Sequence, residues 1–137
     1  CGGAGAGPEF SGQSAVHTHM TNSRLTDAEI LELRFPVLIE SFSIRKGSGG
    51  KGRHNGGDGV VHRIRFLKAM NAAILSNHRR IAPFGLDGGG AGQTGLNCVE
   101  RKDGRVETLG ATDSVLLEDG DVFVLKTPGG GGFGTPE

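Results

Sequence analysis

The sequence predicts a mainly β protein, α+β at most: a glycine-rich β-sandwich or barrel-like domain of antiparallel hairpins with one short helix near residues 27–34. Three observations support this prediction. The 137 residues include 26 glycines without a Gly-X-Y period, and β-like runs lie between them. Several of these runs alternate apolar and polar residues, as strands with one solvated face do. The chain has no Trp or Tyr and only seven Phe, so its core must be mainly aliphatic.

Residues 14–22 contain enough β-forming residues for a short strand. A period of two would then place His17 and His19 on one face. A His-x-His pair is a metal-ligand spacing, but zinc takes three or four protein ligands, and no further Cys/His cluster lies nearby in the sequence. We therefore expect no metal site, and we interpret His17, His19 and Asn22 as the polar wall of a cleft or as structural hydrogen-bonding groups.

A helix is expected to follow, and the sequence contains a capping signal for its N-terminus. Thr26 is the predicted N-cap, and Glu29, three residues later, completes a capping box. Ile30 and Leu33 would face the core. Pro36 disfavours helical geometry at the residue before it and should end the helix after about two turns.

Two predicted strands flank a glycine-rich connection. In residues 37–45, alternation places Leu38, Phe42 and Ile44 on one face and Val37 and Ile39 on the other. In residues 60–67, it places Val60, His62, Ile64 and Phe66 on one face and Arg63 and Arg65 on the other. The second pattern is that of a strand with one wet side.

The connection, residues 47–59, has seven glycines in thirteen positions. Such a stretch is either an elaborate link between strands or a loop shaped around an anion. It formally fits the dinucleotide fingerprint, but it leads into a strand instead of opening a helix. It also lacks the first glycine and the Ser or Thr of a P-loop. We therefore predict no nucleotide site here.

Residues 72–76 read as another strand that delivers Arg79 and Arg80 into a glycine-rich loop. Adjacent arginines at the end of a strand are a plausible clamp for a carboxylate or a phosphate, because the guanidinium fork suits both anions. Surface arginines beside acidic neighbours are the alternative. The sequence leaves both open.

The last third predicts two hairpins. Residues 96–100 and 105–109 would pair across Asp103-Gly104, a type I′ turn signal. Residues 114–117 and 122–126 would pair across the next turn. The four glycines at 129–132 are costly to order, so they are either a frayed tail or a segment fixed against another domain.

Charge and composition exclude several function classes. The formal net charge is zero, which argues against nucleic-acid and membrane-surface binding. The charges are uneven, however, because residues 45–80 contain nine basic residues and only one acidic residue. This basic middle segment either packs against the acidic tail or a partner domain, or forms a surface that faces an anion. Cys1 and Cys98 form no disulfide framework, and a signal peptide or a long apolar run is absent. We expect a reducing, cytoplasmic setting.

The chain starts without Met inside a glycine tract, which suggests a segment of a longer polypeptide. Seven stretches together resemble the C-terminal end of the hydantoinase B/oxoprolinase family. They are Cys1-Gly-Gly-Ala-Gly-Ala-Gly7, Val16-His-Thr-His-Met-Thr-Asn22, Phe35-Pro-Val37, Arg45-Lys-Gly-Ser-Gly-Gly-Lys-Gly-Arg53, Gly56-Gly-Asp-Gly59, Pro83-Phe-Gly85 and Thr127-Pro-Gly-Gly-Gly-Gly-Phe-Gly134. The resemblance covers essentially residues 1–137, which we take as a single domain.

The resemblance implies an enzyme that opens cyclic amides such as 5-oxo-L-proline with ATP, by phosphorylation of the lactam oxygen. In this family the nucleotide site lies in the hydantoinase A half. The resemblance therefore implies no cofactor in this segment, ATP and Mg in the full enzyme, and contacts with the A half, with the rest of the B half and between copies in an oligomer. Departures at His54-Asn55, His62 and Phe133 bear on the choice of substrate within the family.

The leading hypothesis is a C-terminal domain that forms part of an active-site wall and is inactive alone. Its candidate anion contacts are Arg79 and Arg80, and its candidate polar wall is His17, His19 and Asn22. The alternatives are a purely structural assembly module of a hydantoinase- or carboxylase-type relative, and a free-standing β protein that binds a metal or a ligand. The sequence leaves the catalytic residues unassigned.

Overall fold

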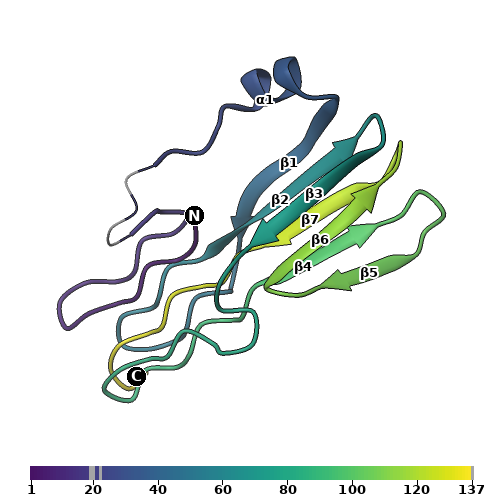
Figure 1. The fold of residues 1–137 in the computed structure, drawn as a ribbon. Coiled ribbons are helices and arrows are strands. Elements are labelled where there is room, and N and C mark those ends of the chain that lie inside the picture. Colours follow the sequence, from purple (N-terminus) through teal and green to yellow (C-terminus); the bar gives the residue numbers. More distant parts are fainter. Residues whose placement is uncertain (19–20, 22, 137) are drawn as a thin grey trace.

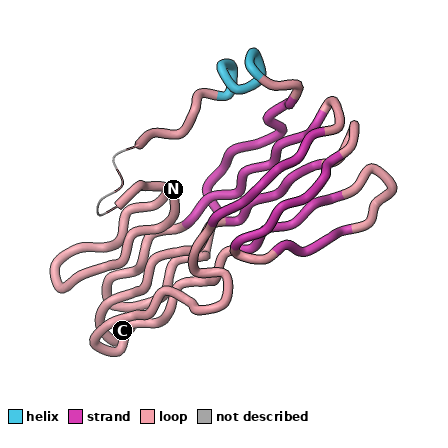
Figure 2. Tube along the Cα trace, in the orientation of Figure 1, coloured by secondary structure: helices cyan, strands magenta, loops and turns pink. Residues whose placement is uncertain are grey.

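The computed structural model describes residues 1–18, 21 and 23–136. Its elements are α1 (Ala28–Arg34), β1 (Val37–Arg45), β2 (Gly59–Phe66), β3 (Met70–Leu75), β4 (Leu96–Glu100), β5 (Val106–Leu109), β6 (Thr112–Leu117) and β7 (Val122–Lys126). The strands occupy one half of the molecule and glycine-rich loops the other, with α1 beyond one end of β1 (Figures 1 and 2). The predicted mainly β fold with one short helix is confirmed.

The strands form two antiparallel sheets. The larger has the order β1-β2-β7-β4-β5, and the smaller pairs β3 with β6. Side chains of both sheets meet in one core, whose buried members are Val37, Phe66, Val99, Leu117 and Phe123. Met70, Ala72, Ile74 and Val115 of the smaller sheet pack against them. The larger sheet runs from β1 to β5 without closing, so the architecture is an open sandwich and the barrel alternative was wrong.

The opposite face of the larger sheet carries a small apolar cluster beneath an ion-pair network. Cys98, Val122 and Val124 are buried there. Arg63 donates two hydrogen bonds to Glu100, at 2.8 and 2.7 Å, and one to Glu40 at 3.2 Å, while Arg65 also pairs with Glu40. The bond to Glu100 raises the pKa of Arg63, and the same bond lowers the pKa of Glu100. Part of the basic middle thus meets the acidic tail, as one of the two readings expected.

A β-bulge in β1 corrects the predicted faces of that strand. Ile39 pairs with Ile64, but the next paired residue, Ser41, is opposite Arg63, so Glu40 is the extra residue. Phe42 therefore pairs with His62 and joins the core face with Ile39. Simple alternation failed because a bulge adds one residue and reverses the facing of every residue that follows.

The helix begins and packs differently from the prediction. Asp27, not Thr26, is the N-cap, and its side chain accepts a hydrogen bond from the Glu29 amide. Leu31 is the helix residue that packs against the core. Leu33 remains 86% exposed, so the predicted core face of the helix was wrong.

One of the two predicted hairpins forms. β4 and β5 pair as expected, but Gly104 has positive φ and Asp103 does not, so the turn is not type I′. The second hairpin was wrong, because β6 pairs with β3 and the chain then crosses to the larger sheet, where β7 lies between β2 and β4. The crossing is held by Asp121, whose carboxylate accepts a hydrogen bond from the Glu118 amide at 2.9 Å.

The loop half is a bundle of extended segments that lie side by side (Figure 2). We call it the glycine bundle and define it as residues 2–14, 47–59, 83–95 and 127–134. The last segment bonds to all the others: the Gly3 amide donates to the Pro128 carbonyl, Gly50 to Gly130 and Leu86 to Gly132. The four C-terminal glycines are buried. They are fixed within their own chain, which neither alternative from the sequence had described.

A Cβ added at each of residues 129–132 would meet the three neighbouring segments in turn, with a repeat after three residues. A Cβ on Gly129 would lie 1.9 Å from the Ser48 carbonyl oxygen, one on Gly130 1.9 Å from that of Ala4, and one on Gly131 1.8 Å from that of Phe84. At Gly132 the contact returns to residues 47–59, at the carbonyl oxygen of Lys51. This is the period of a polyproline II helix, and side chains cannot fit between segments packed this closely.

Candidate functional site

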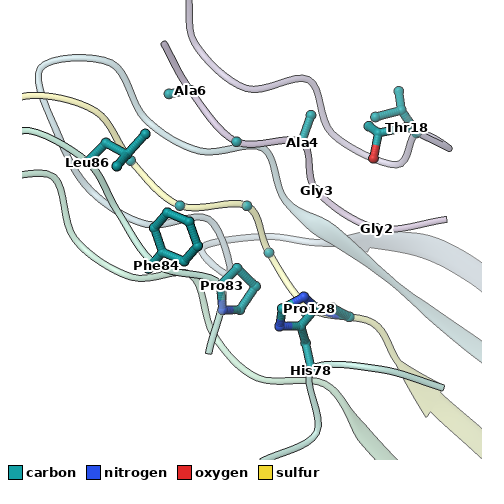
Figure 3. A pocket seen from close by; sticks show the side chains of 16 residues that line it. Gly2, Gly3, Ala4, Ala6, Thr18, His78, Pro83, Phe84, Leu86 and Pro128 are labelled. Atoms are coloured by element: carbon teal, nitrogen blue, oxygen red, sulfur yellow. The ribbon is translucent and has the colours of Figure 1, made fainter. Parts of the chain in front are cut away.

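A groove runs along the glycine bundle with a cavity volume of about 570 Å³. Its floor is the segment at 128–132, and its two walls are residues 2–6 and 83–86 (Figure 3). Pro83, Phe84 and Leu86 line one wall, and Phe84 is 74% exposed. The groove is thus a channel of backbone and apolar side chains with room for a small ring.

His78 lies at one end of this groove, beside Pro128 (Figure 3). Its Nδ1 is 3.0 Å from the Ile81 carbonyl oxygen, which can only accept, so Nδ1 donates in this hydrogen bond. Its backbone has φ of 53°, a conformation rare outside glycine. Neither feature is readable from the sequence, and His78 was not among the predicted site residues.

A second cavity of about 220 Å³ brings Arg79 and Arg80 together. His78 lines it as well, and therefore lies between the cavity and the groove. Arg80 is exposed, whereas Arg79 is half-buried. Of the predicted site residues, the structure brings these two together at one open surface.

The side chain of Arg79 is held by the fold. Its Nε donates to the Asn97 Oδ1 at 2.9 Å, and its Nη1 donates to the Asn77 carbonyl at 2.6 Å. Asn97 is fully buried, and its Nδ2 donates to Ser76 and to the carbonyl of Gly110. Burial lowers the pKa of Arg79, and the nearby charge of Arg45 lowers it further.

The loop at 47–59 is a structural connection in which the chain itself uses the amides. The Gly49 amide donates to the Asp58 carboxylate at 2.8 Å, Gly57 donates to the Ala4 carbonyl and Gly59 to the Ser48 hydroxyl. Burial raises the pKa of Asp58, but hydrogen bonds from residues 47–49 outweigh it and hold the pKa below its usual value. The loop does not fit a triphosphate, because these donors already have acceptors.

The predicted polar wall is only partly described. His19 and Asn22 lie outside the described residues. His17 is exposed, and its neighbours Val16 and Thr18 line the groove while His17 does not. The predicted strand is absent over residues 14–18, where Val16 forms an isolated bridge to Gly2 and Ala15 has φ of 55°.

Among the described residues, no group of three or more His, Cys, Asp or Glu side chains could hold a metal ion. No helix in the described part of the chain is long and apolar enough to cross a membrane.

Curated relatives match the whole chain. It is 50% identical over 133 residues to 5-oxoprolinase of Dictyostelium discoideum, covering 97% of this chain and 10% of the relative. It is 49% identical over 134 residues to 5-oxoprolinase 1 of Arabidopsis thaliana, covering 98% of this chain and 11% of the relative. The chain thus spans about a tenth of the length of these relatives.

Two solved structures share the fold. The nucleotide-free structure of acetone carboxylase matches with a TM-score of 0.82 and 22% identity, over 97% of this chain and 22% of that one. The ATP-dependent caprolactamase of Pseudomonas jessenii matches with a TM-score of 0.76 and 24% identity, over 98% of this chain and 24% of that one. The family model described as hydantoinase B/oxoprolinase matches residues 1–136. The chain therefore belongs to the hydantoinase B/oxoprolinase family.

Proposed function

We propose that this chain is the C-terminal β-rich domain of an ATP-dependent 5-oxoprolinase, which converts 5-oxo-L-proline, ATP and water to L-glutamate, ADP and phosphate. The observation that carries the proposal is the 50% identity to a 5-oxoprolinase over 97% of the chain. Because the chain spans a tenth of that relative, the activity belongs to the full-length enzyme and the isolated chain is inactive.

The proposed partners are those that the family resemblance implies. They are a hydantoinase A-type half that binds ATP and Mg, the remainder of the B half, and further copies in a cytoplasmic oligomer. Most amides of residues 47–59 already donate hydrogen bonds within the chain, so we assign no step of nucleotide chemistry to this chain.

In this proposal the chain supplies part of the active-site wall. The apolar wall at 83–86 shields the lactam ring from water, and the cavity at Arg79 and Arg80 binds an anionic group of the substrate. A positioned guanidinium is suited to that task because it can donate two parallel hydrogen bonds to a carboxylate. His17, His19 and Asn22 are proposed as further polar wall.

The test uses Arg79→Ala and Arg80→Ala in the full-length enzyme. Loss of a charge-assisted contact to a reacting anion costs about 2–4 kcal/mol in the barrier. At least one variant should therefore lose tenfold or more of its 5-oxo-L-proline-dependent ATP hydrolysis. Arg105→Ala is the matched control, since Arg105 is 71% exposed and pairs with Asp103 far from the cavity. Full activity in both test variants would contradict the proposed site.

A structural assembly module is the second candidate, and one observation favours it. Leu33 and Leu75 are each 86% exposed and Ile81 is 78% exposed, and many other large apolar side chains of the described residues are exposed as well. We expect such residues to be covered by the rest of the enzyme. Leu33→Ser and Leu75→Ser should then lower the melting temperature of the full-length enzyme while the unfolding of the isolated chain hardly changes.

A further inference from the structure

Arg45 and Arg79 are half-buried cations that have no carboxylate partner among the described residues. The ion pairs in the described part of the chain use Arg63, Arg65, Arg101, Lys102 and Arg105. Arg45 instead donates to neutral oxygens, namely the carbonyls of Thr94 at 2.8 Å and Thr127 at 3.1 Å. Arg79 does the same with Asn97 and Asn77.

The two guanidinium groups converge on residues 94 and 95. Arg45 bonds to the carbonyl of Thr94. Arg79 lies against Gly95, where a Cβ would come within 2.4 Å of its Nη1. The Gly95 amide in turn donates to the His78 carbonyl at 2.9 Å, which ties this point to the rim of the 220 Å³ cavity.

Two like charges held this way favour an anion beside them. Burying a cation is costly unless an opposite charge compensates it, and neutral acceptors compensate it only in part. The Nη2 of Arg79 has no hydrogen-bond partner among the described residues. Every buried side-chain nitrogen or oxygen of these residues does have a partner. Nη2 is therefore accessible from open space. The side chains of Arg79 and Arg80 both line the 220 Å³ cavity.

We propose that this cavity binds a carboxylate, with Arg79 and Arg80 as the contacting residues and Arg45 as a positioning residue. The carboxylate belongs either to the lactam substrate or to an Asp or Glu side chain from elsewhere in the enzyme. The substrate arm rests on the proposed function, because 5-oxo-L-proline carries a carboxylate on its ring. If the substrate supplies the carboxylate, Arg79 and Arg80 determine the specificity of the enzyme for acidic lactams.

The experiment compares two lactams in the full-length enzyme: 5-oxo-L-proline and 2-pyrrolidone, the same ring without the carboxylate. KM and kcat for 5-oxo-L-proline are measured from ADP release. 2-Pyrrolidone is tested as an inhibitor, and its inhibition constant is measured against 5-oxo-L-proline. Arg79→Gln and Arg45→Gln remove charge, Arg79→Lys and Arg45→Lys keep it, and Arg105→Gln is the matched control. The melting temperature of each variant is recorded.

If the substrate supplies the carboxylate, Arg79→Gln raises KM for 5-oxo-L-proline at least tenfold and Arg45→Gln raises it about threefold. The inhibition constant of 2-pyrrolidone stays unchanged, and the Lys variants recover most of the loss. If an enzyme side chain supplies it, the Gln variants lower the melting temperature more than the Lys variants do, and they weaken both lactams equally.

Variants with wild-type KM and melting temperature overturn the inference, and so does an equal loss of stability in Gln and Lys variants, which would mark purely structural hydrogen bonding. These results are distinguishable from a failure of the proposed function. In that case the wild-type enzyme itself would show no ATP hydrolysis dependent on 5-oxo-L-proline.

Discussion

Nη1 of Arg101 donates a 2.7 Å hydrogen bond to the carboxylate of Asp121, and this contact ties the β4–β5 turn to the crossing between β6 and β7. Asp121 is only 3% exposed. It also accepts hydrogen bonds from the amides of Lys102 and Glu118, at 3.0 and 2.9 Å. One carboxylate therefore fixes the point at which the chain changes sheets.

Asp121→Asn should destabilise the chain by about 2 kcal/mol, because an amide group replaces one buried acceptor oxygen with a donor, while Arg101 keeps its ion pair with Glu107. Urea denaturation measures the free energy of unfolding. Asp103→Asn is the control: its pair with Arg105 is exposed, so it should cost well under about 1 kcal/mol. Equal losses in the two variants would contradict the role given to Asp121.

The pH dependence of stability should follow from the same carboxylate. Burial raises the pKa of Asp121, but hydrogen bonds from Glu118, Arg101 and Lys102 outweigh it, so the pKa lies below its ordinary value of 3.8. A depressed folded pKa adds stability above the unfolded pKa, and that stability is lost as the pH falls through the folded value. Stability should decline from about pH 5 to pH 2, and less steeply in Asp121→Asn. Parallel curves for the two proteins would refute this.

Gly130→Ala should destabilise the glycine bundle by about 3 kcal/mol or more, because its Cβ would lie 1.9 Å from the Ala4 carbonyl oxygen. Gly5→Ala is the matched control. Its Cβ would meet the Gly131 carbonyl oxygen at 3.9 Å, an ordinary contact, and it should leave the melting temperature nearly unchanged. Thermal unfolding of both variants decides whether close backbone packing holds the bundle.

The thiol of Cys98 should react slowly with iodoacetamide. Cys98 is 6% exposed, and burial together with the nearby Glu100 raises its pKa, so little thiolate is available. Cys1 is half-buried and should react faster. Mass spectrometry of the labelled protein, before and after denaturation in urea, gives the two rates. Fast labelling of Cys98 in the folded protein would contradict its burial.

Local chemistry in the sequence was enough to predict most of the elements, although the strand that it predicted over residues 14–18 is absent. Alternation in residues 60–67 predicted which side of β2 faces the core, since each of its residues has a partner in β1 without interruption there. Asp103-Gly104 marked a real turn, and Pro36 marked a real helix end. In the candidate site, the run that delivers Arg79 and Arg80 to an open surface was visible, because strand ends and glycine-rich loops are local signals.

Tertiary structure decided what depends on partners distant in the chain. β6 pairs with β3 and not with β7, and at the crossing between them Asp121 accepts hydrogen bonds from residues 101, 102 and 118. The glycines at 129–132 are ordered because three other segments surround them, and no local pattern specifies that. Likewise, Arg79 is half-buried near Arg45 because Arg45, at the end of β1, and Arg79, in the β3–β4 loop, both contact residues 94 and 95. Sequence determines which residues can form a strand, a turn or an anion contact, while packing between distant segments determines which of these contacts exist.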